Sequence, residues 1–296
     1  MADKLPNVSV IGLGLIGSSI ICAIKYFGAA ATVTGFDASK EVLLEAEKIG
    51  LPVNLVDDIR AAVKDADIIF LAVPVGAMAG VVKQIISNLK PGAILTDTGS
   101  TKRSVIDDIN PLVLPHISFV PGHPLAGTEF SGPSAGFPTL FKDHYWLLIG
   151  DKKTNSAISV IKRFCEKLGA MVEVMDANYH DKVLAITSHL PHLIAFTIVG
   201  TASDLEHDLK NDVIRFSASG FRDFTRIAAS DPTMWRDVFL NNDEAVLEML
   251  QRFTEDLAFL QKAINQREGD KLLNLFKRTG EIRRSIIDIG FAKEGS

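Results

Sequence analysis

The chain has 296 residues, of which 47% are apolar and 23% charged, and its formal net charge is -5 at pH 7. This length favours two domains, each able to bury its own core, and the negative charge argues against nucleic acid as the main partner. The longest apolar run, 68–82, is broken by proline and glycine and is too short to cross a bilayer, so we predict a cytoplasmic protein with no transmembrane helix and no membrane partner.

The first half of the chain alternates short β-branched runs with helical patterns. We predict strands at 8–11, 32–36, 68–73, 94–96, 118–120 and 146–149. The run at 68–73 is apolar at every position, as expected for a strand that is covered on both faces. This alternation predicts an α/β fold, in which a Rossmann-type parallel sheet is wrapped by helices.

Helical patterns occupy the rest of the chain. They lie at 178–203, around Asp208–Ala228, at 232–265 and at 269–289. We therefore predict a Rossmann-type domain over 1–176 and an all-helical domain over 177–296. The last two stretches carry more apolar surface than a small domain buries alone, which weakly favours a homodimer over packing within one chain.

A glycine-rich turn follows the first predicted strand and opens a helix. Gly12 allows the tight turn, Gly14 lets a pyrophosphate approach the backbone, and Gly17 permits close packing of the helix on the strand. The helix N-terminus at Leu15 and Ile16 offers unpaired N–H groups to the phosphates. A secretory signal peptide is the alternative for this apolar stretch, but it has no use for three glycines at this spacing.

An acidic residue follows at the expected distance. Asp37 ends the second predicted strand about 20 residues after Gly17, where a carboxylate accepts hydrogen bonds from the adenosine ribose hydroxyls. It would repel the 2′-phosphate of NADP, so NAD is the predicted cofactor, although the nearby Lys40 leaves some NADP use open. Pro74 follows the strand at 68–73, at the sheet edge where nicotinamide is usually seated. An ordinary surface aspartate beside a glycine turn is the alternative.

Two polar turns, 97–102 and 122–129, are predicted at the same sheet edge. A histidine there, His123, can accept a proton from a substrate hydroxyl while hydride leaves the same carbon. A hydroxyl side chain such as Ser100 can fix the orientation of that ring. The sequence therefore predicts a catalytic centre between these turns.

The helical half adds two histidines and an arginine. His189 and His192 are three residues apart and share a predicted helix face, although simple helix packing is the alternative. They lack ligands at metal-site spacing, so we predict no metal. Asp223 and Arg226 share the next helix face, where the carboxylate can hold the guanidinium for bidentate carboxylate binding. A solvated ion pair is the alternative there.

Five motifs follow one another between Val8 and Trp235: GLGLIGS, DTGSTK, GHPLAGTE, SHLPH and GFRDFTRIA. In this combination and order the chain resembles the prephenate/arogenate dehydrogenase family. The resemblance implies NAD as cofactor, a homodimer formed through the helical domain, and oxidation of prephenate or arogenate with decarboxylation. The products would be 4-hydroxyphenylpyruvate or tyrosine, and prephenate is slightly favoured.

The resemblance also implies roles for individual residues. His123 corresponds to the base that deprotonates the ring hydroxyl, and Ser100 to a serine that hydrogen-bonds in the same centre. Arg226 corresponds to the arginine that binds a substrate carboxylate, with Asp223 orienting it, and His192 to a histidine of the side-chain pocket. Less defined substrate-binding roles fall on His189, Thr128, Glu129 and Trp235.

Two other functions fit parts of the pattern. A β-hydroxyacid dehydrogenase shares the two-domain plan but uses a lysine as acid or base, which His123 and Ser100 argue against. A non-catalytic NAD-binding protein would have a blocked cleft.

Glu129 can either meet the ammonium of arogenate or brace its loop. We expect a monofunctional enzyme, because the stretches before Val8 and after Ile289 are too short for a mutase or regulatory domain.

Overall fold

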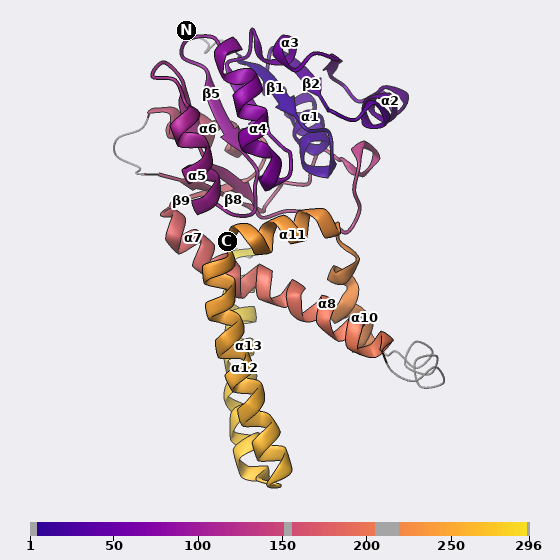
Figure 1. The fold of residues 1–296 in the computed structure, drawn as a ribbon, viewed down its shortest axis with the longest axis vertical. Helices are drawn as coiled ribbons and strands as arrows, with labels where there is room; N and C mark the ends of the chain where they lie inside the picture. Colours follow the sequence, from indigo (N-terminus) through magenta and orange to yellow (C-terminus); the bar gives the residue numbers. More distant parts are fainter. Residues whose placement is uncertain (1–4, 151–155, 205–218, 295–296) are drawn as a thin grey trace. The chain divides into compact units, whose positions relative to one another are not determined.

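A computed structural model describes residues 5–150, 156–204 and 219–294 of the chain. The chain divides into two compact units, Met1–Val246 and Leu247–Ser296 (Figure 1). The predicted segment around Asp208–Ala228 begins outside the described residues.

A six-stranded sheet forms the centre of the first unit. Its strands are β1 (Asn7–Ile11), β2 (Thr32–Phe36), β3 (Asn54–Leu55), β4 (Ile68–Leu71), β5 (Ile94–Asp97) and β6 (Ser118–Val120). They run in the order β3-β2-β1-β4-β5-β6, and every pairing is parallel. This order confirms the predicted Rossmann-type fold, and it reverses between β1 and β4, where such sheets bind ligands.

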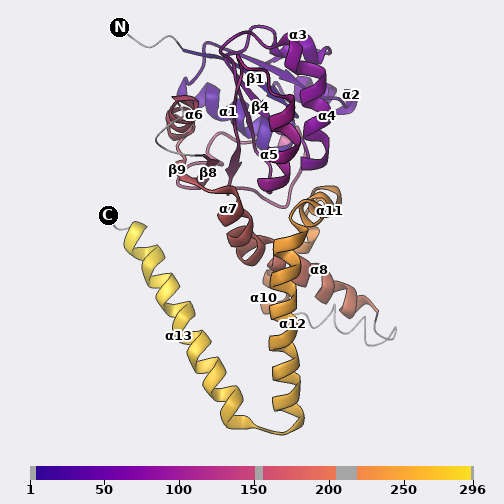
Figure 2. The ribbon, with the colours of Figure 1, turned by 60° about the vertical axis from the view of Figure 1, so that its left-hand side comes forward.

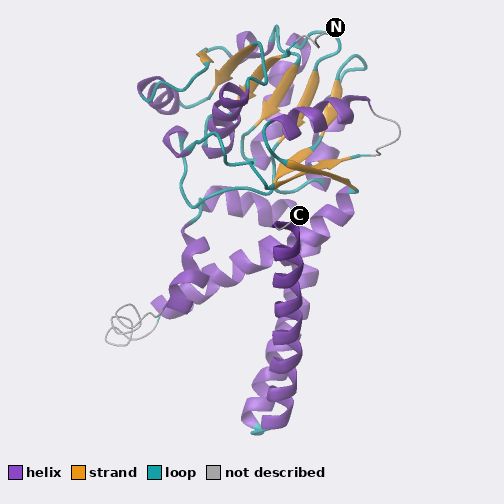
Figure 3. Cartoon of the chain, turned by 180° about the vertical axis from the view of Figure 1, so that it is seen from behind, coloured by secondary structure: helices purple, strands orange, loops and turns teal. Residues whose placement is uncertain are grey.

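Helices cover both faces of this sheet (Figure 3). They are α1 (Leu15–Phe27), α2 (Lys40–Lys48), α3 (Ile59–Val63), α4 (Val75–Ile85), α5 (Arg103–Ile109) and α6 (Ser156–Lys167). Helices α1 and α6 pack on one core, with Ile20, Phe70 and Phe164 among its residues. Helices α3, α4 and α5 pack on the other, which includes Leu71 and Val82. The strands are therefore buried on both sides, as their continuous apolar runs predict.

A second, three-stranded sheet corrects two details of the sequence analysis. It contains β7 (Gly122–Pro124), β8 (Tyr145–Ile149) and β9 (Met171–Met175), with β7 antiparallel and β9 parallel to β8. The strand predicted at 146–149 thus exists but does not belong to the parallel sheet. The segment predicted as a turn at 122–129 begins with the strand β7. The sequence did not indicate this strand, because its residues include glycine and proline, which are both rare in strands. The apolar pattern of a strand does not identify its pairing partner.

The chain passes from β9 into a run of helices (Figure 2). In the first unit these are α7 (Ala177–Leu184), α8 (Leu190–Ser203), α10 (Ser219–Thr225), α11 (Pro232–Asn241) and the start of α12 (Asp243–Asn265). A π-helical turn, Ala185–His189, joins α7 to α8 just before Pro191, which cannot donate a helical hydrogen bond. The helix predicted at 232–265 is broken at Asn242.

One helical segment in the described part of the chain, Ala177–Ser203, is long and apolar enough to cross a membrane, with a hydropathy of 1.6. Length and composition are weak evidence, because core helices pass the same test. This segment also carries His180, Asp181 and His189, all buried against the rest of the first unit. Within the single chain, 28% of the apolar window in this segment is buried.

The second unit holds most of α12 and the helix α13 (Gly269–Glu294). Large apolar side chains on these helices are exposed in the single chain, among them Leu257, Phe259, Leu273 and Phe276. Exposed apolar side chains in such number are typical of a surface that a partner covers.

Candidate active site

The glycine-rich turn lies where the strand order reverses. Gly12 has φ +96°, and a Cβ there would be 2.4 Å from the carbonyl oxygen of Ala72 after β4. A Cβ on Gly17 would be 1.9 Å from the Gly12 carbonyl oxygen, whereas one on Gly14 would meet nothing within 4 Å. Side chains are therefore excluded where β1, β4 and α1 meet, and space remains open above Gly14.

The N-terminus of α1 fits a pyrophosphate. Gly14 is its N-cap, and no side chain forms a cap hydrogen bond there. The first N–H groups of a helix, here those of Leu15, Ile16 and Gly17, have no intrahelical partner and attract anions. Pro74 is exposed three residues after the end of β4, as the N-cap of α4, on the other side of the point where the strand order reverses.

Asp37 has a second role beside the one predicted. Its carboxylate accepts hydrogen bonds from the backbone N–H of Leu13 at 2.8 Å and of Ser39 at 2.9 Å. It thereby braces the glycine-rich turn. Each carboxylate oxygen has a further lone pair, and the side chain is half-buried, so the acceptor capacity for ribose hydroxyls is retained. The turn, the helix end and this carboxylate together fit NAD.

A buried ion pair fixes the two polar turns to one another. Lys102 pairs with Asp97, and both side chains are 0% exposed. The Lys102 Nζ also donates to the Gly122 carbonyl oxygen at 2.7 Å, and the Gly122 N–H donates to Asp97 Oδ1 at 3.1 Å. Burial lowers the pKa of Lys102, and the attraction of Asp97 opposes that shift. The pair positions the start of β7 and therefore His123.

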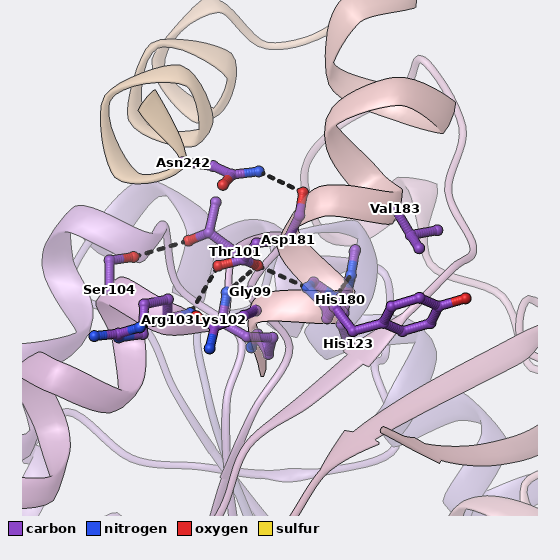
Figure 4. A network of polar contacts seen from close by, with 12 residues as sticks. Gly99, Thr101, Lys102, Arg103, Ser104, His123, His180, Asp181, Val183 and Asn242 are labelled. Carbon is purple, nitrogen blue, oxygen red and sulfur yellow. Dashed lines mark hydrogen bonds and ion pairs between the residues drawn. The ribbon is translucent and has the colours of Figure 1, made fainter. Parts of the chain in front are cut away.

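His123 is buried and belongs to a chain of hydrogen bonds (Figure 4). Its Nδ1 lies 2.9 Å from Nε2 of His180, whose Nδ1 lies 2.7 Å from Oδ1 of Asp181. The Asp181 carboxylate accepts the backbone N–H groups of Lys102 and Arg103, each at 2.8 Å. Three side chains from β7 and α7 are thus linked to the N-terminus of α5.

The surroundings keep His123 uncharged. Burial lowers its pKa well below 6.5, and the nearby His180, Lys102 and His189 lower it further. A neutral imidazole can accept a proton, whereas an imidazolium cannot. His123 is therefore ready to act as a base at neutral pH.

His189 is linked to the same network through Asn242. The Asn242 side-chain N–H₂ donates to the Asp181 carbonyl oxygen at 2.9 Å and lies 3.0 Å from His189 Nδ1. His189 Nδ1 must therefore accept, which leaves the ring proton on Nε2. Burial lowers the pKa of His189 to about 4, so the ring is neutral. Its edge faces Trp235, with ring centroids 6.1 Å apart.

A second group of predicted residues gathers around Trp235, which is itself buried. The His192 ring stacks on it with centroids 3.6 Å apart, and His192 Nδ1 donates to the Ser188 carbonyl oxygen at 2.9 Å. Arg226 Nη1 donates to Glu129 Oε2 at 3.1 Å. Burial lowers the pKa of His192, the hydrogen bond to the Ser188 carbonyl raises it, and the charge of Arg226 lowers it.

Three predicted side chains have different surroundings from those expected. Ser100 is half-buried, but the hydrogen-bond partner of His123 is His180. The exposed Asp223 does not pair with Arg226: α10 ends at Thr225 and Arg226 opens a 3₁₀ turn, so the two do not share one continuous helix face. The exposed Thr128 uses its hydroxyl to accept the Phe130 N–H at 3.3 Å.

The sequence analysis missed other members of the network. His180, Asp181 and Asn242 stand in no recognised motif, and an adjacent His-Asp pair at the start of a helix was the only local signal. Asp97 and Lys102 lie in the polar turn but received no role. Among the described residues, no group of three or more His, Cys, Asp or Glu side chains is arranged to hold a metal ion.

The chain matches two family descriptions, one after the other along the sequence. Residues 21–174 match "Prephenate dehydrogenase, nucleotide-binding domain", and residues 176–278 match "Prephenate dehydrogenase, dimerization domain". It is 43% identical to a cyclohexadienyl dehydrogenase from Zymomonas mobilis, over 95% of this chain and 96% of that protein. It is 32% identical to a prephenate dehydrogenase from Bacillus subtilis, over 97% of this chain and 77% of that one.

A solved structure gives the same result. The prephenate dehydrogenase of A. aeolicus, crystallised with hydroxyphenyl propionate and NAD+, superposes with a TM-score of 0.87 and 31% sequence identity. The match covers 97% of this chain and 100% of that one.

Proposed function

Because the chain belongs to the prephenate dehydrogenase family, we propose that it oxidises prephenate or arogenate with loss of carbon dioxide, in tyrosine biosynthesis. It is an NAD-dependent oxidoreductase. The observation that best supports this function is a buried, neutral His123 in β7, which follows the carboxyl end of β6 and so lies at the edge of the parallel sheet where the glycine-rich turn and Pro74 lie.

The first unit provides what NAD requires. The N-terminus of α1 would hold the pyrophosphate, Asp37 the adenosine ribose, and the backbone around Pro74 the nicotinamide side. Bound NAD supplies the acceptor for the hydride that leaves the hydroxyl-bearing ring carbon. Asp37 supports NAD over NADP, because its carboxylate can accept hydrogen bonds from the ribose hydroxyls, whereas its negative charge opposes a 2′-phosphate.

His123 would move one proton in two directions. As hydride leaves the ring carbon, the hydroxyl proton passes to Nε2 of His123, and the carbon–oxygen bond becomes a carbonyl. Carbon dioxide then leaves the opposite ring carbon, its bonding electrons enter the ring, and the oxygen becomes a phenolate. That phenolate can take the proton back from Nε2. The net reaction consumes no proton, so one histidine suffices as base and then acid.

Arg226 would bind a substrate carboxylate. The chain is acidic overall, so an anionic substrate needs local positive charge. The Arg226 side chain is 58% exposed, and Glu129 engages only one of its nitrogens. The remaining N–H groups can form a forked contact with a carboxylate. Its neighbours His192 and Trp235 would line the side-chain pocket, with His189 behind them.

The Glu129–Arg226 pair also bears on the choice between the two substrates. Glu129 would be the natural partner for the ammonium of arogenate, but its carboxylate already pairs with Arg226. This supports prephenate ahead of arogenate.

The other expectations are proposals of the same kind. The helical part matches a family dimerization domain, and the exposed apolar residues of α12 and α13 support a homodimer. We place the boundary between the two functional domains at residue 176. A cytoplasmic location, without nucleic-acid or membrane partners, remains a prediction.

The deciding experiment is an assay of NADH or NADPH absorbance with the purified chain. NAD and NADP are each combined with prephenate and with arogenate, giving four reactions. We expect turnover with NAD and prephenate, and formation of 4-hydroxyphenylpyruvate. Absence of turnover in all four, from folded protein that binds NAD, would overturn the proposal.

A further inference from the structure

We propose that His180 and Asp181 are positioning residues that hold His123 in one tautomer, with the proton on Nδ1 and the lone pair of Nε2 free for the substrate. This inference rests on the proposed function of His123 as the base. It assigns a role to two buried side chains outside the motifs that identify the family.

The direction of each hydrogen bond in this network follows from Asp181, the residue at which the network ends. The Asp181 carboxylate accepts hydrogen bonds from two backbone N–H groups, those of Lys102 and Arg103. Both of its oxygens therefore already act as acceptors. An ionised carboxylate is an acceptor only, and the N-terminus of α5 further favours its negative charge. The His180 Nδ1, 2.7 Å away, must then be the donor.

This arrangement fixes the next two protons. A neutral His180 with its proton on Nδ1 has a lone pair on Nε2. The only way to satisfy the 2.9 Å contact with His123 is for His123 Nδ1 to donate to it. His123 Nε2 is then left unprotonated, which is the state that a base requires.

The same arrangement supports the charge that forms during the reaction. When His123 Nε2 takes the substrate proton, the ring becomes an imidazolium, and its Nδ1–H points at His180. The carboxylate of Asp181 lies on the opposite side of the His180 ring, with its Oδ1 2.7 Å from His180 Nδ1. An orienting carboxylate that does not itself become protonated stabilises an imidazolium in the Ser-His-Asp triad. In this protein the His180 imidazole lies between the Asp181 carboxylate and the His123 ring.

Charged and titratable groups face this relay from several elements. Asp97 and Lys102 lie beside it at the end of β5 and before α5, and His189 lies beside it from the π-helical turn. Burial lowers the pKa of His180, while its hydrogen bond to Asp181 raises it. Burial alone would raise the pKa of Asp181, but hydrogen bonds from His180 and the backbone hold that pKa below its usual value.

A purely structural role is the competing account, since Asp181 also joins α7 to the first turn of α5. The two accounts differ in the tautomer of His123. A structural contact leaves the position of that proton unspecified, whereas the relay requires it on Nδ1.

The test begins with the wild-type protein and needs no substrate. Histidine nitrogen NMR of the full chain labelled with ¹⁵N distinguishes the two neutral tautomers, and the His123 signals are assigned by their loss in His123→Asn. We expect protons on Nδ1 of both His123 and His180. A His123 ring protonated on Nε2 would overturn the relay, whether or not the enzyme turns over prephenate.

Two substitutions then separate the relay from packing. His180→Phe keeps a ring but removes the acceptor, whereas His180→Gln can keep an acceptor near the former Nε2. We expect His180→Phe to lower kcat by at least about tenfold, to shift the acid limb of the pH profile and to mix the tautomers of His123. His180→Gln should retain more of kcat. His116→Gln, at an exposed position, is the matched control.

The outcomes are distinguishable. If the wild type oxidises prephenate and folded His180→Phe has the same kcat, pH profile and His123 tautomer, the relay is wrong and the proposed function stands. If the wild type oxidises neither substrate, the proposed function fails while the spectra still decide the tautomer. If His180→Phe does not fold, the wild-type spectra and His180→Gln decide.

Discussion

Arg226 and Glu129 lie 97 residues apart in the chain and form an ion pair of 3.1 Å between Nη1 and Oε2. The pair joins the turn after β7 to the 3₁₀ turn after α10. It therefore connects the sheet part that carries His123 with the helical part that carries His192 and Trp235. Both side chains are partly exposed, so the pair contributes little to folding stability, about 0–1 kcal/mol.

Arg226→Gln tests the carboxylate-binding role. Loss of a charged, forked donor should raise KM for prephenate by about tenfold or more, with a smaller change in kcat. Glu129→Gln is the companion variant, and it should change KM much less because it leaves the guanidinium in place. Steady-state kinetics with saturating NAD give both values. Equal effects of the two variants would argue that the ion pair, rather than the arginine, matters.

His123→Asn tests the base. Asparagine is neutral and polar but cannot accept the proton, so kcat should fall by about a hundredfold or more. The affinity for NAD, measured by titration of the protein's tryptophan fluorescence, should stay largely unchanged. Turnover close to that of the wild type would remove His123 from the mechanism.

The predictable part of this site is the part encoded over short distances. Gly12 and Gly14 lie in one turn, Gly17 lies in the first turn of the helix that follows, and Asp37 follows the adjacent strand, so their spacing alone predicts a dinucleotide site. The parallel sheet follows from the alternating pattern in the same way. The two-residue β3 is too short to leave such a pattern.

The relay could not be predicted because it is assembled from distant segments. The His123 and His180 contact spans 57 residues, and the contact from Lys102 to Asp181 spans 79. Neither contact follows from a helical or strand repeat in the sequence, because the folded chain brings the segments together, with α7 packed against α5. The wrong partner assigned to Arg226 has the same origin, because a local i,i+3 rule cannot anticipate Glu129.

His189→Gln tests the pH dependence of stability. Folded His189 has a pKa of about 4, whereas an unfolded histidine titrates near 6.5. Between these values the unfolded chain binds more protons than the folded one, so the free energy of unfolding falls as the pH falls. The variant lacks this proton uptake. Its deficit against the wild type should therefore shrink by about 2 kcal/mol between pH 7 and pH 5.

Urea unfolding at the two pH values measures that deficit. The exposed His116→Gln, measured at the same two pH values, is the control for loss of one histidine. A His189→Gln deficit that stays constant or grows at pH 5 would show that His189 is not a buried neutral ring.

Asp37→Asn tests cofactor choice. Removing the charge should weaken NAD and reduce the repulsion of a 2′-phosphate, so the ratio of kcat/KM for NAD over NADP should fall by about tenfold. The exposed Asp57→Asn is the matched control for loss of one negative charge. Because Asp37 also accepts N–H groups of the glycine-rich turn, a small loss of thermal stability should accompany the change. An unaltered ratio would leave Asp37 as a brace alone.

Gly14→Ala and Gly17→Ala should separate cofactor binding from folding. At position 17 the added Cβ would lie 1.9 Å from a carbonyl oxygen, so α1 must move away from β1 and the free energy of unfolding should drop by several kcal/mol, about 3 or more. At position 14 the Cβ meets nothing within 4 Å, so thermal stability should stay near that of the wild type. The same methyl group would project into the space assigned to the pyrophosphate, and KM for NAD should rise by about tenfold. Thermal unfolding and NAD kinetics of both variants check the pair; normal NAD binding by Gly14→Ala would move the pyrophosphate away from the N-terminus of α1.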